Sequence, residues 1–125
     1  MRDHGIRMLS ATTLIGDDVR NPDGEDLGTV KDLVIDLRNG RTAYAVLDFG
    51  GFLGIGNKLF AVPFEAMTVN TVEKHIILDV DKERLENAPG FDKNDWPQHA
   101  NYDFVDEVHR YYGLAPYSAS AGVPA

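Results

Sequence analysis

Apolar residues along the chain first come in short, partly alternating runs and later recur at helical spacing. Residues 27–37 and 42–49 are rich in β-forming side chains with partial alternation, which is typical of strands with one buried face. Asn39 and Gly40, which lie between the two runs, are the pair preferred in a two-residue hairpin turn. The pattern therefore predicts a β-hairpin over residues 27–49.

Further short strands are predicted after this hairpin. Residues 58–63 form a strand candidate that ends at Pro63, because proline cannot donate to a strand ladder. Residues 64–67 suit a single helical turn, and residues 68–72 and 74–80 suit a last pair of strands. Many short strands separated by turn signals are typical of a small barrel or a rolled sheet.

The last third of the chain changes from strand to helical patterning. Asp81 is a good N-cap for a short helix over residues 82–87. Residues 91–98 show no regular pattern. Residues 101–112 place apolar side chains close to an i, i+3, i+4 spacing, which predicts a second short helix. Gly113 is expected to end that helix.

These patterns divide the chain into four parts. We expect a flexible lead over residues 1–12, a closed or nearly closed barrel over residues 13–80, a helical and aromatic extension over residues 81–116, and a flexible tail over residues 117–125. The length of 125 residues suits one domain. The predicted fold class is mainly β, a small antiparallel β-barrel with a short C-terminal helical extension.

Composition narrows the classes of partner. The 20 acidic residues outnumber the 12 basic ones and give a net charge of −8, which disfavours nucleic acid and anionic membranes. The chain contains no cysteine, which excludes disulfides and cysteine metal sites. No apolar stretch approaches the ~18 residues that a membrane helix needs, and the N-terminus lacks the apolar segment of a signal peptide. We therefore expect a cytoplasmic protein with no nucleic-acid partner and no membrane span.

Several segments of the chain resemble the PRC-barrel family. They are LIGDDV at 14–19, NPDGEDLG at 21–28, VID at 34–36, AYAVLDFGGFLGIG at 43–56, FAVPF at 60–64, LENAPGFD at 85–92 and DWP at 95–97. The resemblance implies a small β-barrel. It also implies a docking and support role, as in the cytoplasmic domain of the photosynthetic reaction centre H subunit and the C-terminal domain of a ribosome maturation factor.

The glycine-rich segment 50–56 has three possible interpretations. Two of its glycines have P-loop spacing, but Asn57 comes before the lysine and a strand follows in place of a helix, which weakens the case for a phosphate cradle. The glycines also suit a β-turn or a bulge. Alternatively, the loop presents Phe52, Leu53 and Ile55 to a partner.

Candidate metal and catalytic groups are few. His99, Asp103, Asp106 and His109 could gather on a helix and hold a divalent metal, but polar residues opposite an apolar stripe are ordinarily a solvated face. The acidic segment 17–26 does not fit an EF-hand register. The serines all lie in the expected flexible ends, whereas catalysis needs a rigidly placed nucleophile. We therefore expect no cofactor, no metal and no catalytic centre.

Aromatic residues are concentrated in the C-terminal part of the chain. The residues concerned either cover the barrel core, which is the interpretation we favour, or anchor a partner; they are Trp96, Tyr102, Tyr111, Tyr112 and Tyr117. In the predicted strand 42–49, alternation places Tyr44 and Val46 on the face away from the barrel interior. Either the C-terminal helix or a second subunit must cover them.

These observations predict a non-catalytic protein-binding or assembly module of the PRC-barrel type that forms a homodimer. The apolar loop residues or the C-terminal aromatic residues would form the contact, and a two-fold dimer is the commonest closed assembly. The alternative is a small-molecule or ion-binding, stress-related protein that uses the barrel mouth or the acidic turn.

Overall fold

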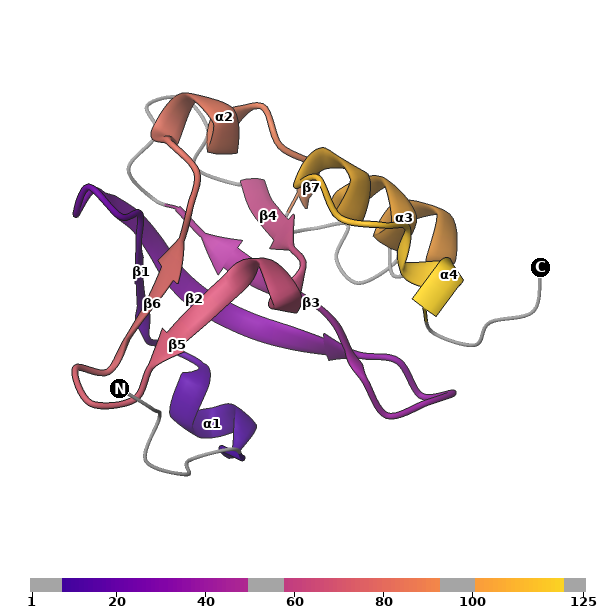
Figure 1. Cartoon of the computed structure of the whole chain (residues 1–125), viewed down its shortest axis with the longest axis horizontal. Coiled ribbons are helices and arrows are strands. Elements are labelled where there is room, and N and C mark those ends of the chain that lie inside the picture. Colours follow the sequence, from indigo (N-terminus) through magenta and orange to yellow (C-terminus); the bar gives the residue numbers. More distant parts are fainter. Residues whose placement is uncertain (1–7, 50–57, 93–100, 121–125) are drawn as a thin grey trace.

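The computed structural model describes residues 8–49, 58–92 and 101–120. The elements within these ranges, shown in Figure 1, are α1 (Ala11–Leu14), β1 (Asp18–Arg20), β2 (Asp26–Ile35), β3 (Thr42–Asp48), β4 (Lys58–Val62), the 3₁₀ turn η1 (Phe64–Ala66), β5 (Met67–Asn70), β6 (His75–Leu78), α2 (Lys82–Glu86), β7 (Gly90–Asp92), α3 (Tyr102–Tyr111) and α4 (Tyr117–Ser120).

The strands form one mixed sheet in the order β5-β6-β1-β2-β3-β4-β7. Neighbouring strands are antiparallel except β1 and β6, which run parallel with Val19 opposite Ile76. Among the described strands, β5 and β7 are the two ends of the hydrogen-bonded order. The prediction of a closed or nearly closed, purely antiparallel barrel is therefore wrong, whereas the mainly β class with a C-terminal helical extension is confirmed.

The chain passes from β4 to β5 through η1 alone. Pro63 has no backbone N–H and cannot continue the β4 ladder. The backbone N–H of Ala66 donates to the carbonyl of Pro63 at 3.0 Å and closes the turn. Val62 before this turn and Met67 after it belong to the same buried cluster. The sheet therefore curls around a shared core, and a helical turn joins β4 to β5 where the closed barrel would need a ladder.

The predicted hairpin is confirmed as the pair β2 and β3, but its turn is longer than two residues. The backbone N–H of Asp36 donates to the carbonyl of Arg41, and that of Gly40 donates to the carbonyl of Asp36, both at 2.8 Å. The carboxylate of Asp36 accepts from the N–H of Arg38, and the amide oxygen of Asn39 accepts from the N–H of Arg41. These side-chain bonds stabilise a four-residue loop between Asp36 and Arg41.

Turn chemistry also explains the acidic segment between β1 and β2. Asn21 is buried, and its side-chain oxygen accepts from the N–H groups of Asp23 and Glu25. Its amide nitrogen donates to the carboxylate of Glu25 at 2.7 Å and to the carbonyl of Val80 at 3.3 Å. Asn21 therefore shapes this turn and connects it to the chain just after β6.

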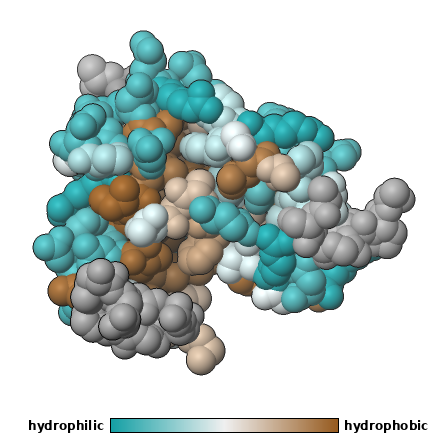
Figure 2. Space-filling model, viewed as in Figure 1, coloured by the Kyte–Doolittle hydropathy of each residue, from teal (hydrophilic) through white to brown (hydrophobic). Residues whose placement is uncertain are grey.

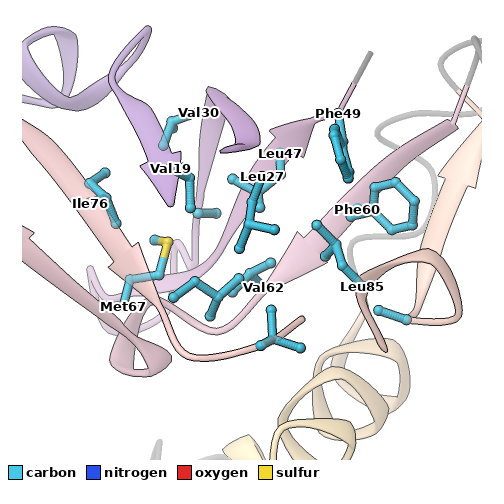
Figure 3. Packing of buried hydrophobic residues seen from close by; sticks show 14 of the residues in the cluster. Val19, Leu27, Val30, Leu47, Phe49, Phe60, Val62, Met67, Ile76 and Leu85 are labelled. Atoms are coloured by element: carbon cyan, nitrogen blue, oxygen red, sulfur yellow. The ribbon is translucent and has the colours of Figure 1, made fainter. Parts of the chain in front are cut away.

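The main core lies inside the curled sheet. Figure 3 shows the side chains of this core pointing toward one another from several strands of the curled sheet, together with Leu85 of α2. The core consists of Leu14, Val19, Leu27, Val30, Ala45, Leu47, Phe49, Phe60, Val62, Met67, Ile76, Leu78, Val80, Leu85 and Ala88.

A second core, which is a separate cluster of buried residues, lies on the outer face of β3, β4 and β7. It consists of Ala43, Tyr44, Val46, Leu59, Ala61, Phe91, Val105, Val108 and Tyr117. The last three come from α3 and α4, so the C-terminal helices provide the cover that Tyr44 and Val46 require. Ala43 also joins this face although alternation predicts the opposite one, because the register of β2 and β3 shifts between Val34 and Ile35.

The two predicted helices of the extension are confirmed as α2 and α3. Asp81 caps α2 by accepting from the N–H of Arg84 at 2.7 Å, and Asn101 caps α3 by accepting from the N–H of Phe104 at 2.9 Å. Gly113 follows α3 with a φ of 77°, as expected for a residue that ends a helix.

Three short elements differ from the sequence-based expectations. α1 begins inside the segment expected to be flexible, and β7 lies in the segment expected to be irregular. Tyr117, the first residue of the expected flexible tail, is completely buried and begins α4. In each case a buried apolar residue (Leu14, Phe91 or Tyr117) fixes a segment whose local composition is polar.

Candidate interaction surface

One carboxylate links the tip of the β2–β3 hairpin to both C-terminal helices. Asp36 accepts from the hydroxyl of Tyr102 at 2.9 and 3.0 Å and from the hydroxyl of Tyr117 at 2.9 Å. The two tyrosine rings stack with centroids 6.2 Å apart. Figure 1 shows the tip of this hairpin projecting from the sheet on the side where α4 lies.

The electrostatics of Asp36 favour its charged form. Burial raises its pKa, but the hydrogen bonds from the backbone N–H of Arg38 and from both tyrosine hydroxyls, together with the charge of Arg38, outweigh this and hold the pKa of Asp36 below 3.8. Burial, and then the neighbouring carboxylate, raise the pKa of Tyr102. Both tyrosines therefore act as donors to an ionised acceptor at neutral pH.

A second group of contacts connects the hairpin to η1 and α3. The guanidinium of Arg41 lies over the ring of Tyr117, 4.7 Å from its centroid, and contacts the carboxylate of Glu65 at 2.5 Å. Nε2 of His109 lies 3.6 Å from the other oxygen of Glu65, and its Nδ1 is 2.9 Å from the carbonyl of Val105. Arg41 of the hairpin, Glu65 of η1 and His109 of α3 therefore lie next to one another.

A third contact fixes α4 on α3. Asp106 accepts from the backbone N–H of Ser118 at 2.8 Å and from its hydroxyl at 2.7 Å. Burial raises the pKa of Asp106, but these two bonds and the charges of Arg110 and His109 lower it further than burial raises it. The expectation that Asp106 and His109 lie on a solvated helix face is wrong, since both are buried.

The same hairpin end exposes apolar side chains to solvent. Leu37 is 95% exposed and Ile35 is 46% exposed. Met8 and Leu9, next to α1, are also exposed. A single exposed apolar residue is ordinary, whereas a continuous apolar area is typical of an interaction site.

An apolar groove of about 550 Å³ lies beside these residues. Figure 2 shows apolar residues gathered in the middle of this face, with hydrophilic residues around them. The groove is bounded by α1, the end of the hairpin, η1 and β5. Its lining consists of Met8, Leu9, Ala11, Leu14, Leu33, Ile35, Thr42, Phe64, Val69 and Thr71. We call the groove, together with Ile35 and Leu37, the hairpin-end surface.

The predicted contact residues fall into two groups. Phe52, Leu53, Ile55 and Trp96 lie outside the described residues. Tyr111 and Tyr112 are half-buried and pack against the main core; their role in partner binding stays a prediction.

Two contacts join Tyr111 to Arg84 of α2. The hydroxyl of Tyr111 donates to the carbonyl of Arg84 at 2.5 Å, and the guanidinium of Arg84 lies 4.5 Å from its ring centroid. Burial raises the pKa of Tyr112. Tyr111 therefore connects the end of α3 to α2.

Sequence reasoning included Tyr102 and Tyr117 among the aromatic residues that cover the core, but it missed the hydrogen bonds by which they link the hairpin to the extension. Asp36 belongs to a turn signal, which hides its second role as an acceptor for Tyr102 and Tyr117. Tyr117 lies in a small, polar tail whose composition indicates flexibility. Its aromatic ring at the beginning of that tail is the local signal that indicates packing.

Neither a metal cluster nor a membrane-spanning helix is found in the described parts of the chain. Residues 8–49, 58–92 and 101–120 contain no group of three or more His, Cys, Asp or Glu side chains arranged to hold a metal ion. No helix in these ranges is long and apolar enough to cross a membrane.

No curated protein matches the chain. Among solved structures, it is similar to a 16S ribosomal RNA processing protein described as RimM from Pseudomonas aeruginosa, with 14% identity and a TM-score of 0.44. That similarity covers 66% of this chain and 50% of the other, so it spans about half the length of that protein.

The family comparison covers more than half of the chain. The model of the PRC-barrel domain matches residues 7–85, a range that contains β1–β6 and most of α2. The match ends before α3, so Asp36 and Glu65 belong to the family domain, whereas Tyr102, His109 and Tyr117 belong to the extension. This chain is therefore a member of the PRC-barrel domain family.

Proposed function

We propose that this chain is a non-catalytic protein-binding or assembly module that acts as a homodimer. The observation that carries the proposal is the hairpin-end surface, where Leu37 and Ile35 lie exposed beside an apolar groove of about 550 Å³. An exposed apolar surface of this kind, bounded by polar residues, is typical of a contact between proteins.

The second core supports this choice of surface. The chain's own helices cover the outer face of β3 and β4, so this face does not need a partner. The hairpin-end surface has apolar residues that remain open. Its position on a two-stranded projection suits a two-fold contact, in which the same surface of both copies meets.

The polar groups near this surface support a non-catalytic role. Asp36, Asp106 and Arg41 bond to groups of the protein itself and join the hairpin to the extension. These contacts give the three side chains a structural role.

The cytoplasmic location expected from the sequence stays a prediction.

Sedimentation of three proteins tests the proposal. We expect the wild type to form a dimer at high concentration, because burying the hairpin-end surface removes apolar area from water. We expect an Ile35→Ser, Leu37→Ser double variant to remain monomeric. The matched control is Val72→Ser, which changes a 77% exposed residue in the β5–β6 turn that does not line the groove; it should dimerise as the wild type does.

The outcomes separate the possible surfaces. A wild type that stays monomeric at high concentration contradicts the homodimer. A double variant that still dimerises contradicts the hairpin-end surface as the contact. In that case a Phe52→Ser, Leu53→Ser double variant tests the glycine-rich loop.

A further inference from the structure

The loop at the tip of the β2–β3 hairpin contains the one asparagine of the chain that a glycine follows, Asn39 before Gly40. Asn39 is exposed, and a Cβ on Gly40 would meet nothing within 4 Å, so solvent reaches this part of the loop. Glycine has the widest backbone freedom and no Cβ to shield its nitrogen. The backbone nitrogen of Gly40 can therefore attack the side-chain amide carbon of Asn39, which is the first step of deamidation.

This reaction needs water as its co-reactant and no other reagent. The nitrogen of Gly40 loses its proton to solvent base and forms a bond to Cγ of Asn39. The bond from Cγ to Nδ2 then breaks, and the nitrogen leaves as ammonia after it takes up a proton. Water opens the resulting cyclic succinimide at either carbonyl and gives aspartate or isoaspartate at position 39. The net change adds one negative charge to the loop.

The folded loop engages all the reacting groups in other bonds. The backbone N–H of Gly40 donates to the carbonyl of Asp36 at 2.8 Å, and the side-chain oxygen of Asn39 accepts from the N–H of Arg41 at 2.9 Å. Nδ2 of Asn39 donates to the hydroxyl of Tyr117 at 3.4 Å. The attack requires these bonds to open, so the rate follows the population of the open loop. Because Tyr117 begins α4, the packing of α4 against the hairpin limits the reaction.

The product does not suit the folded arrangement. The hydroxyl of Tyr117 has one hydrogen, which it donates to Asp36 at 2.9 Å, and it accepts the bond from Asn39. A carboxylate at position 39 has no hydrogen to donate, and its charge would lie near that of Asp36, where like charges repel. We propose that Asn39 is a modification site, at which deamidation loosens α4 from the hairpin.

Peptide mass spectrometry of the full chain, kept in mildly alkaline buffer, tests the site. We expect conversion of amide to acid to be faster at Asn39 than at Asn87. Asn87 is the matched control within the same protein, because it is also exposed and its Nδ2 also donates a hydrogen bond, to the carbonyl of Glu83 at 3.0 Å. The residue after it is Ala88, whose methyl group hinders the attack.

The same measurement on Tyr117→Phe tests the control by α4. This variant removes the hydroxyl that bonds to Asn39 and keeps the buried ring, so we expect conversion at Asn39 to become about fivefold faster. The matched variant is Tyr111→Phe, which removes a hydroxyl that donates to the carbonyl of Arg84 in α2. Conversion at Asn39 in this variant should keep the wild-type rate.

The effect of the product is measured in Asn39→Asp by amide hydrogen exchange. The N–H of Ser118 donates to Asp106 at 2.8 Å and reports on the docking of α4 against α3. We expect it to exchange about fivefold faster in Asn39→Asp than in the wild type, because the variant loses a hydrogen bond to α4 and gains a repulsive charge. Asn87→Asp adds the same charge away from α4 and should leave this exchange unchanged.

Three results would overturn the proposal. Equal conversion at Asn39 and Asn87 would reject the modification site. An unchanged rate in Tyr117→Phe would show that α4 does not limit the reaction; slow exchange of the Val46 amide in β3 checks that this variant keeps its sheet. Unchanged exchange of Ser118 in Asn39→Asp would show that the product leaves α4 in place. This last test does not depend on the folding of Tyr117→Phe.

Discussion

At the scale of single residues, Asp36 has two roles that act over different distances. Its bond to the N–H of Arg38 is local and helps to form the hairpin turn. Its bonds to Tyr102 and Tyr117 reach residues 66 and 81 positions away. The first role follows from the residue type in a turn. The second exists only because α3 and α4 lie beside the hairpin.

The substitution Asp36→Asn should destabilise the protein by about 1 kcal/mol at neutral pH, because an amide replaces a charged acceptor and turns N–H donors toward the tyrosine hydroxyls. Urea unfolding measures this free energy. Asp18→Asn, an exposed change on β1, is the control and should have little effect. Equal stability of the Asp36 variant and the wild type would contradict the structural role of this carboxylate.

The same variant should change the response to acid. The folded pKa of Asp36 lies below its ordinary value of 3.8, so the folded state binds fewer protons than the unfolded chain near that pH. The stabilisation from Asp36 is therefore present above pH 3.8 and is lost as the pH falls through the lowered pKa. We expect a shallower loss of stability in acid for Asp36→Asn than for the wild type, measured by unfolding at several pH values.

At the scale of elements, Gly28 allows β2 to pass close to β3. Its φ is 107°, a conformation that glycine adopts without strain, and a Cβ at this position would overlap the carbonyl oxygen of Asp48. Gly28 also pairs with Val19 where the register of β1 and β2 shifts. The absence of a side chain at Gly28 therefore allows β1, β2 and β3 to pair closely.

Gly28→Ala should lower the free energy of unfolding by more than Gly24→Ala. Both residues have positive φ, but a Cβ on Gly24 would meet nothing within 4 Å. Backbone strain of about 1–3 kcal/mol applies to each variant, and the overlap with Asp48 adds to it only at Gly28. Chemical denaturation of both variants measures the difference. Equal destabilisation would mean that the strand can move away from the new methyl group.

The elements predicted from the sequence are those whose signals are local. The β2–β3 hairpin, α2 and α3 each have their turn or capping residues within a few positions, and the structure contains all three. β7 was missed because its three residues form a strand only by pairing with β4. α1 was missed because its one buried side chain, Leu14, packs on distant strands.

At the scale of the whole molecule, the extension completes the fold outside the family domain. The family match ends at residue 85, and α3 and α4 then cover Tyr44, Val46, Leu59 and Ala61. These apolar groups would face water without the two helices. The extension therefore has a structural role outside the range that the family match covers.

A chain that ends at residue 100 should have a lower melting temperature than the full chain and should bind a hydrophobic dye, because truncation exposes the outer apolar face of the sheet. A chain that ends at residue 120 keeps both helices and is the control; it should behave as the full chain does. Thermal unfolding followed by circular dichroism gives the comparison. If the shorter chain melts as the full chain does, the second core contributes little to stability.

The sequence by itself determined the mainly β class, the hairpin and the two helices of the extension, because alternation, turn residues and caps act within a few positions of the chain. The family followed from the resemblance of several segments to known members. Only the tertiary structure decided that β1 pairs parallel with β6, that a helical turn joins β4 to β5, and that Tyr117 and Asp106 are buried. These outcomes depend on residues far apart in sequence, such as Val19 and Ile76. Their pairing follows from how the whole sheet curls around its core, which no local pattern encodes.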